Sequence, residues 1–372
     1  MKYLFLSPYG VINDWRFAEN QLQKTISLNN DVAIITCGSI LKKSCVAIKA
    51  HTEKYKNNFF RKRICNRCIS NQTKYSDGFK TFAIENYLEK NDYNLISKNL
   101  DQLNKDNFVN FKFENMELGK RSLFENMLIF KKNDLLFSDK QFLEIKNTIE
   151  SLLIFVIAIK RISKEFHPDF VISQNGNYSL SSTFNNYFKQ LGSVAYSWEA
   201  SNHYLYRTQK LLISKNHNNF GLNSIKNNWR LKLCNNKVSK KNLTNVNSHF
   251  RTIINAKALR NFSKSYKKNE DSARDFFKIK EKKIALLNTS SWDEIIGTYI
   301  LRDININKLI IFKSQEEWVQ KCIKFFSNHK DISLIIRPHP RDFYNKNSNL
   351  MNYIKNLNDL PKNILINTPD DQ

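Results

Sequence analysis

Short apolar runs alternate along the chain with segments whose apolar residues recur every three or four positions. Residues 2–7 form an apolar run that ends at the turn signal Pro8-Tyr9-Gly10, and residues 31–36 form a second run rich in β-branched side chains. Between them, residues 17–28 carry apolar side chains at helical spacing. A strand, a helix and a strand in this order predict a βαβ unit, and therefore a parallel sheet.

The same pattern returns twice further along the chain. A strand at 169–173, a helix at 178–190 and a strand at 193–198 follow one another, and Gly192 ends the helix. A third α/β pattern begins at residue 283, with strands expected at 284–288, 333–336 and 363–366, a weaker apolar run at 309–312, and helices at 316–326 and 346–356.

These patterns predict an α/β protein with two Rossmann-like domains that face a cleft. The first domain is expected at 1–205, with an irregular cysteine-bearing loop at 37–75 and a mostly helical insertion at 79–165. A basic, acid-poor connector at 206–282 then leads to the second domain at 283–372. About four strands are expected there, which is fewer than a complete domain of this type has, so the second domain is expected to be truncated.

The charge is strongly basic, with 59 Lys and Arg against 34 Asp and Glu and a net charge of +25 in 372 residues. Codon usage rich in A and T would also enrich Lys and Asn, and is an alternative explanation of the total. It does not explain residues 200–269, which hold fifteen Lys or Arg and no acid. This stretch predicts an anionic partner, such as a phospholipid surface, a lipid pyrophosphate or a polyanionic glycan. No motif of a specific nucleic-acid module accompanies it.

The N-terminal run lacks the small-residue cleavage site of a signal peptide. The most strongly apolar stretch, 151–159, is shorter than the ~20 residues of a membrane span. We therefore expect a cytoplasmic protein, attached peripherally to the inner face of the plasma membrane by its basic connector. The six cysteines should then be reduced thiols or metal ligands.

The sharpest motif is Arg337-Pro338-His339-Pro340, which follows an expected buried strand. Ligands of open α/β sheets bind beyond the carboxyl ends of strands, and the two prolines stiffen the turn. Arg337 could hold a phosphate in bidentate fashion, while His339 could donate a hydrogen bond or neutralise a leaving group. Ser290 and Ser291, after the first strand of this half, could hold the same phosphate. The alternatives are a plain turn in which His339 caps a carbonyl, and an ordinary helix N-cap.

Cys37, Cys45, Cys65 and Cys68 lie close together in the sequence, and the last two have the spacing of a zinc knuckle. Four thiolates could bind one structural Zn²⁺, with unligated cysteines as the alternative. A redox pair is less favoured because no helix is expected to begin at Cys65. No catalytic metal is expected, since the chain has no Asp-x-Asp motif.

Polar residues at strand ends of the first half are candidates for the acceptor side. Glu199 follows an expected strand and could act as the base toward an acceptor hydroxyl. Asn175 and Gly176 follow the preceding strand, where a glycine lets the backbone approach a ligand. Glu19, in the first helix, could face the same cleft. The alternatives are an ion pair of Glu199 with the basic connector and an ordinary Asn-Gly turn.

Several of these stretches together resemble capsule and surface-polysaccharide glycosyltransferases of the two-Rossmann GT-B class. The residues that carry the resemblance are 287–293, 312–318, 334–340, 168–176, Trp198-Glu199 and the opening Val32–Cys37 with Cys65 and Cys68. Members of this family continue past the strand at 363–366, so the sequence is expected to be C-terminally incomplete.

The resemblance implies metal-independent transfer of a sugar from a nucleotide-activated donor, CMP-, CDP- or UDP-linked, to a growing glycan or its lipid-linked precursor. Arg337 and His339 would hold the donor phosphate, with Ser290 and Ser291 alongside. Two alternatives stay open: a transferase of glycerol phosphate or polyol phosphate from a CDP-linked donor, and a non-catalytic module that binds a membrane or a glycan.

Overall fold

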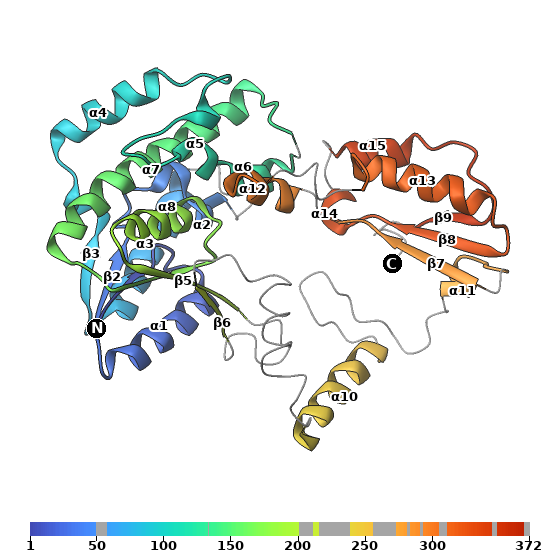
Figure 1. The fold of residues 1–372 in the computed structure, drawn as a ribbon, viewed down its shortest axis with the longest axis horizontal. Helices are drawn as coiled ribbons and strands as arrows, with labels where there is room; N and C mark the ends of the chain where they lie inside the picture. The colour runs from blue at the N-terminus through green and yellow to red at the C-terminus, as the bar shows by residue number, and fades with distance from the viewer. Residues whose placement is uncertain are drawn as a thin grey trace. The chain divides into compact units, whose positions relative to one another are not determined.

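Two compact units make up the chain, one formed by Met1–Ile129 with Leu136–Asn236 and the other by Phe130–Leu135 with Lys237–Gln372 (Figure 1). The computed structural model describes residues 1–49, 58–132, 134–200, 211–215, 239–255, 273–280, 283–290, 293–304, 311–343 and 348–367.

The first unit is built on a six-stranded sheet of order β3-β2-β1-β4-β5-β6. The first five strands in this order are parallel, and β6 pairs antiparallel with β5. The expected α/β fold with a mostly parallel sheet is therefore confirmed. The strands are β1 (Lys2–Leu6), β2 (Asp31–Thr36), β3 (Lys80–Ala83), β4 (Phe170–Gln174), β5 (Val194–Ala200) and β6 (Leu211–Lys215).

Helices surround this sheet, and the longest of them explains the most apolar stretch of the sequence. α7 begins at a capping box between Ser138 and Gln141, and its residues 152–159 are all buried. The helical elements of this unit are α1 (Asn13–Ser27), η1 (Lys42–Ser44), α2 (Val46–Lys49), α3 (Asn58–Ser76), η3 (Ile84–Tyr87), α4 (Lys90–Asp101), η4 (Phe108–Asn110), α5 (Leu118–Arg121), α6 (Leu123–Phe130), α7 (Asp139–Glu165) and α8 (Ser179–Gln190).

The order of the strands fixes where a ligand would bind. β1 lies between β2 and β4 in the sheet. After β1 the chain continues to β2 on one side, and after β4 it continues to β5 on the other side. Ligands of open α/β sheets bind in the crevice at such a switch point. The loops after β1, β2 and β4, together with the end of β5, therefore form the carboxyl edge of this sheet, its candidate functional edge.

The structure corrects three sequence expectations. The segment 37–75 is not an irregular loop, because most of its second half is the 19-residue helix α3. The segment 79–165 is mostly helical as expected, but it is not only an insertion, because it begins with β3, which extends the sheet next to β2. The connector contributes β6, whose pairing with β5 no local pattern indicates. In each case tertiary contacts decide the structure, since α3 has few apolar residues at helical spacing and both strands are short.

The second unit has a three-stranded parallel sheet of order β7-β8-β9. Its core joins Leu287 and Leu334 of the sheet to Val319 and Leu350 of two helices. The described elements are α10 (Lys240–Ile254), α11 (Ala273–Phe276), β7 (Lys283–Asn288), α12 (Asp293–Leu301), α13 (Gln315–Ser327), β8 (Ile332–Arg337), α14 (Pro340–Phe343), α15 (Asn349–Lys355) and β9 (Ile364–Ile366). Of the weaker apolar run at 309–312, only residues 311 and 312 are described, and they are not in a strand.

A partly buried ion pair anchors α4 to α7. Arg161 donates to both carboxylate oxygens of Asp92, over 2.5 and 3.0 Å, and Asp92 also caps the N-terminus of α4. The hydrogen bond from Arg161 is the main reason that the pKa of Asp92 lies below its usual 3.8. The charged form of Asp92 is therefore the one that stabilises the fold.

We expect Asp92→Asn to lower the unfolding midpoint in urea near neutral pH. The pKa of Asp92 is depressed in the folded state, so its contribution is complete above the unfolded-state pKa and is lost as pH falls through the folded-state pKa. The difference in unfolding midpoint between wild type and variant should accordingly stay constant from pH 7 to about pH 4 and narrow as the pH falls below about 4. Asp101→Asn, at the exposed end of the same helix, is the control. A difference that does not narrow below about pH 4 would contradict the assignment.

Candidate functional site

Four cysteines meet at the carboxyl edge of the six-stranded sheet. Cys37 directly follows β2, and Cys45 lies between η1 and α2. Cys65 and Cys68 are three residues apart on α3 and so share one face of that helix. Three separate elements thus bring together the cysteines that the sequence singled out.

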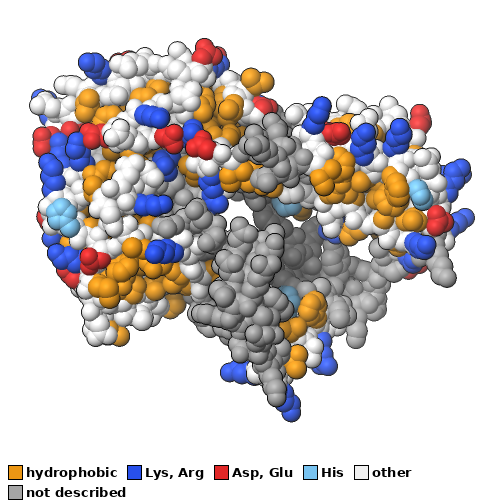
Figure 2. Space-filling model, in the orientation of Figure 1, with side chains coloured by type: hydrophobic (Ala, Val, Ile, Leu, Met, Phe, Trp, Pro, Cys, Tyr) orange, Lys and Arg blue, Asp and Glu red, His pale blue; other side chains and the backbone are white. Residues whose placement is uncertain are grey.

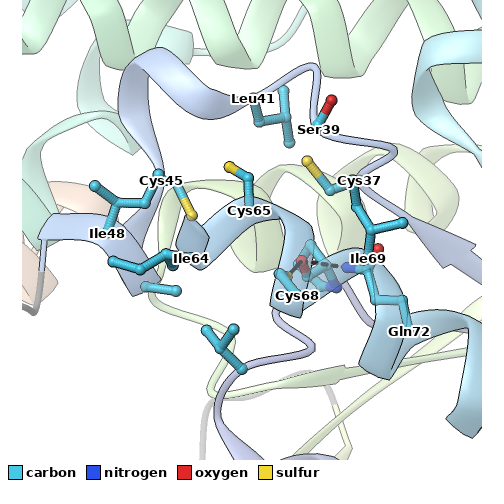
Figure 3. Close-up of a pocket in the computed structure, with 13 residues that line it drawn as sticks. Cys37, Ser39, Leu41, Cys45, Ile48, Ile64, Cys65, Cys68, Ile69 and Gln72 are labelled. Carbon is cyan, nitrogen blue, oxygen red and sulfur yellow. Dashed lines mark hydrogen bonds between the residues drawn. The ribbon is translucent and has the colours of Figure 1, made fainter. Parts of the chain in front are cut away.

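All four cysteines line one cavity of about 20 Å³ (Figure 3). Leu41, Ile48 and Ile64 supply apolar walls, and Cys65 lies between Cys45 and Cys37 in this view. None of the four is in a disulfide. The space is large enough for one small occupant, such as a water molecule or an ion.

Burial favours the protonated form of three of these thiols. It raises the pKa of Cys37 from 9.0 to about 12 and that of Cys45 from 9.0 to about 11. Burial also raises the pKa of Cys68. A protonated thiol is a poor nucleophile, so Cys37, Cys45 and Cys68 are poorly suited to attack a substrate in this state.

The cavity adjoins a more open and basic depression of about 460 Å³. Cys65 lines both spaces, and Lys43, Arg61 and Lys62 line the outer one. α3 carries Arg63 and Arg67 as well, and no acid. The outer depression is therefore basic, whereas the cysteine cavity itself has no basic lining residue. Within the described residues, no group of three or more His, Cys, Asp or Glu is placed so as to hold a metal ion.

α3 also holds the loop that follows β1. Cys68 Sγ accepts a hydrogen bond from the Gly10 N–H over 3.1 Å, and the amide of Gln72 donates to the carbonyl of Pro8 over 2.6 Å. A side chain at Gly10 would sit 2.2 Å from the backbone oxygen of Cys68, so glycine is needed for this close approach. The sequence pattern does not reveal this role of Gly10 and Gln72; only the turn signal Pro8-Tyr9-Gly10 indicates that the chain bends here.

Glu19 does not face an open cleft, contrary to expectation. It is only 4% exposed, and it accepts hydrogen bonds from Arg16 over 2.7 Å and from the indole of Trp198 over 3.4 Å. Arg16, 2% exposed, also contacts Gln23 and Ser76. Burial is the main reason that the pKa of Glu19 is raised. Glu19 is thus part of a buried polar network that joins α1, α3 and β5.

The structure brings Glu199 and Asn175 together at the functional edge, since the N–H of Asn175 donates to the carbonyl of Trp198. Glu199 does not follow β5 as expected; it lies within β5, paired with Leu212 of β6. Its side chain shares the sheet face of Ser197, which contacts α8. Asn175 has a left-handed φ of 45°, while Gly176 is buried beside it, so the tight turn is at Asn175.

In the second unit, the loops after β7 and β8 lie side by side. Asn288 pairs with Arg337, the N–H of Thr289 donates to the carbonyl of Arg337, and the N–H of His339 donates to the hydroxyl of Thr289. The backbone of Ser290 is held at both ends by Gln315 of α13. Ser291 lies outside the described residues. The predicted position of Arg337 and His339 at a strand end is confirmed.

The guanidinium of Arg337 stands out at this edge. Its side chain is half-buried, yet no hydrogen bond or ion pair joins it to any described residue. The carbonyl of His339 accepts from the N–H groups of Asp342 and Phe343, which fixes the loop at the start of α14. A rigid loop thus presents one cation that has no acidic partner among the described residues, an arrangement suited to an anionic ligand.

α10, in the second unit, supplies an amphipathic basic surface. Leu243, Val246 and Phe250 are 53%, 50% and 55% exposed and lie along one side of the helix. Figure 2 shows apolar and basic side chains next to each other in the region of α10, which carries Lys240, Lys241 and Arg251 and no acid. Within the described ranges, no helix combines the length and apolar character that crossing a bilayer requires.

No protein-family model, no curated protein and no solved structure matches this chain. The functional argument therefore depends on the residues and their geometry.

Proposed function

We propose that this protein is a glycosyltransferase that takes a sugar from a nucleotide-activated donor. The observation that carries the proposal is the half-buried guanidinium of Arg337 at the carboxyl edge of β8, without an acidic partner among the described residues. A phosphate is the common anionic group that such a guanidinium binds in bidentate fashion. The side-chain hydroxyl of Ser290, an exposed residue beside Thr289, could donate a further hydrogen bond at the same edge.

The chemistry follows from the donor. The acceptor hydroxyl forms a bond to the anomeric carbon while the bond from that carbon to the phosphate oxygen breaks, and negative charge develops on the leaving nucleotide. Arg337 and His339 would stabilise this charge, with Ser290 and Ser291 alongside. Glu199, beside Asn175 at the edge of the other sheet, would accept the proton of the acceptor hydroxyl. We include a GT-B arrangement of the two units in the proposal.

The acceptor is a glycan or its lipid-linked precursor, and the protein acts in the cytoplasm at the inner face of the membrane. α10 supports this part of the proposal, because exposed Leu243, Val246 and Phe250 beside basic side chains suit the surface of an anionic bilayer. No catalytic metal is part of the proposal.

We expect Arg337→Ala to weaken the binding of nucleoside diphosphates about 10- to 100-fold without unfolding the protein, because hydrogen bonds to a charged group are worth about 1.5–3 kcal/mol. Isothermal titration calorimetry of CDP and UDP against wild type and variant measures this loss. Circular dichroism of the same samples establishes that the fold is kept.

Lys324→Ala is the matched control, since Lys324 is an exposed cation on α13 of the same unit, away from the edge. It should bind nucleotides like the wild type. Equal nucleotide affinities of wild type and Arg337→Ala would refute the phosphate site, and an equal loss in Lys324→Ala would show that only net charge is being measured.

A further inference from the structure

Four soft ligands surround one small cavity that the proposed transfer reaction does not use. Cys37, Cys45, Cys65 and Cys68 come from the end of β2, the segment before α2, and α3. Their thiols are not in disulfides, so a covalent link does not account for their meeting.

We propose that these four cysteines bind one zinc ion, which fastens α3 to the carboxyl edge of the six-stranded sheet. The proposal is independent of the proposed function, because it concerns metal binding and the position of a loop.

The number and type of ligands select the metal. A site of four thiolates is typical of structural zinc, which prefers a closed tetrahedral shell. Cys65 and Cys68 lie on one face of a helix, so two ligands come already paired. The cavity of about 20 Å³ has room for a single ion.

Metal binding requires the four sulfur atoms to turn toward one point, since as they stand they are not placed to hold an ion. Rotation of a thiol between staggered χ1 rotamers moves its sulfur without moving the backbone. Each Zn–S bond forms as a thiol gives its proton to solvent, so one ion displaces four protons and the site gains two negative charges. The basic side chains of α3 can balance this charge, namely Arg61, Lys62, Arg63 and Arg67.

The site would also order the loop after β1. The Gly10 N–H already donates to Cys68 Sγ over 3.1 Å, a contact that commonly supports a metal-bound thiolate. From the same face of α3, Gln72 and Asn71 donate to the carbonyls of Pro8 and Gly10. A zinc ion that fixes α3 would therefore fix the β1–α1 loop at the switch point of the sheet.

The test is the metal content of the full chain, purified under reducing conditions from zinc-supplemented culture and measured by mass spectrometry of elements. We expect one zinc ion per chain in the wild type and at least a tenfold loss in Cys65→Ser. Cys322→Ser, which changes a partly buried cysteine of the second unit, should keep its zinc.

Reconstitution of the wild type with Co²⁺ gives a measurement that does not depend on whether the variants fold. The sulfur-to-metal charge-transfer absorption of a tetrahedral thiolate site should appear. Wild-type protein with less than about a tenth of an ion per chain and no such absorption would overturn the proposal. So would iron with acid-labile sulfide, or equal zinc loss in Cys65→Ser and Cys322→Ser. Failure of nucleotide binding would leave these readouts unchanged.

Discussion

Replacing Glu19 with Ala is expected to destabilise the protein by about 3–5 kcal/mol, because it leaves Arg16 as an uncompensated buried charge. The two side chains form an ion pair of 2.7 Å and are 5% and 1% exposed respectively. The guanidinium would keep its contacts with the neutral groups of Gln23 and Ser76 and its place over the ring of Tyr75, but would have lost its ion pair. For a unit of this size the loss corresponds to a fall in Tm on the order of 10 °C, measured by calorimetry.

Two further variants separate the buried charge from other effects. Asp14→Asn removes an exposed acid from the first turn of the same helix and should cost no more than about 1 kcal/mol. The double variant Arg16→Met with Glu19→Leu removes both charges, and we expect it to recover much of the lost stability. A double variant no more stable than Glu19→Ala would show that the hydrogen bonds of Arg16, not its unpaired charge, dominate the effect.

Gly10→Ala is expected to displace α3 from the loop after β1. Its Cβ would lie 2.2 Å from the oxygen of Cys68 and 3.0 Å from Cγ of Gln72, and backbone cannot yield cheaply at the first of these contacts. We expect a loss of about 1–3 kcal/mol or more, as in other overpacked sites. Hydrogen exchange should increase specifically in residues 58–76, because the bonds from Gly10 and to Pro8 are weakened.

Gly78→Ala is the control for this prediction. Its Cβ would meet nothing within 4 Å, although the φ of +81° makes Ala unfavourable there by about 1–2 kcal/mol. The two variants should therefore differ in hydrogen exchange: only Gly10→Ala should make the residues of α3 exchange faster. Equal hydrogen-exchange rates of α3 in the Gly10→Ala and Gly78→Ala variants would contradict the tight packing of this loop on α3.

The strands of the βαβ units could be predicted because their burial is encoded locally. β2 is found at the predicted residues 31–36, and β4 and β5 differ from prediction by one or two residues. Their β-branched runs suit a parallel sheet covered on both sides. β3 and β6 are the two edge strands of the sheet. Their pairing with β2 and β5 depends on contacts between residues far apart in the sequence, which no local pattern indicates.

The candidate sites divide in the same way. Arg337 and His339 could be placed from the sequence, because a buried run followed by two prolines marks the end of a strand. The meeting of Cys37 with Cys65 and Cys68 could not, because it depends on α3, a helix that the pattern of apolar residues does not reveal. The polar network around Arg16 could not be predicted either, because charged residues on a surface helix ordinarily face solvent and this one is buried by contacts with α3 and β5.

The central claim is that the chain transfers a group from a nucleotide-activated donor. The most direct test measures nucleotide release from CMP-, CDP- and UDP-linked sugars, in the presence of lipid-linked acceptor on anionic vesicles, with mass analysis of the product. We predict release from one donor class, a product with a new glycosidic bond, and loss of both in Arg337→Ala but not in Lys324→Ala. A phosphodiester product would transfer the assignment to the polyol-phosphate transferases. Absence of both release and nucleotide binding with every donor would contradict the claim.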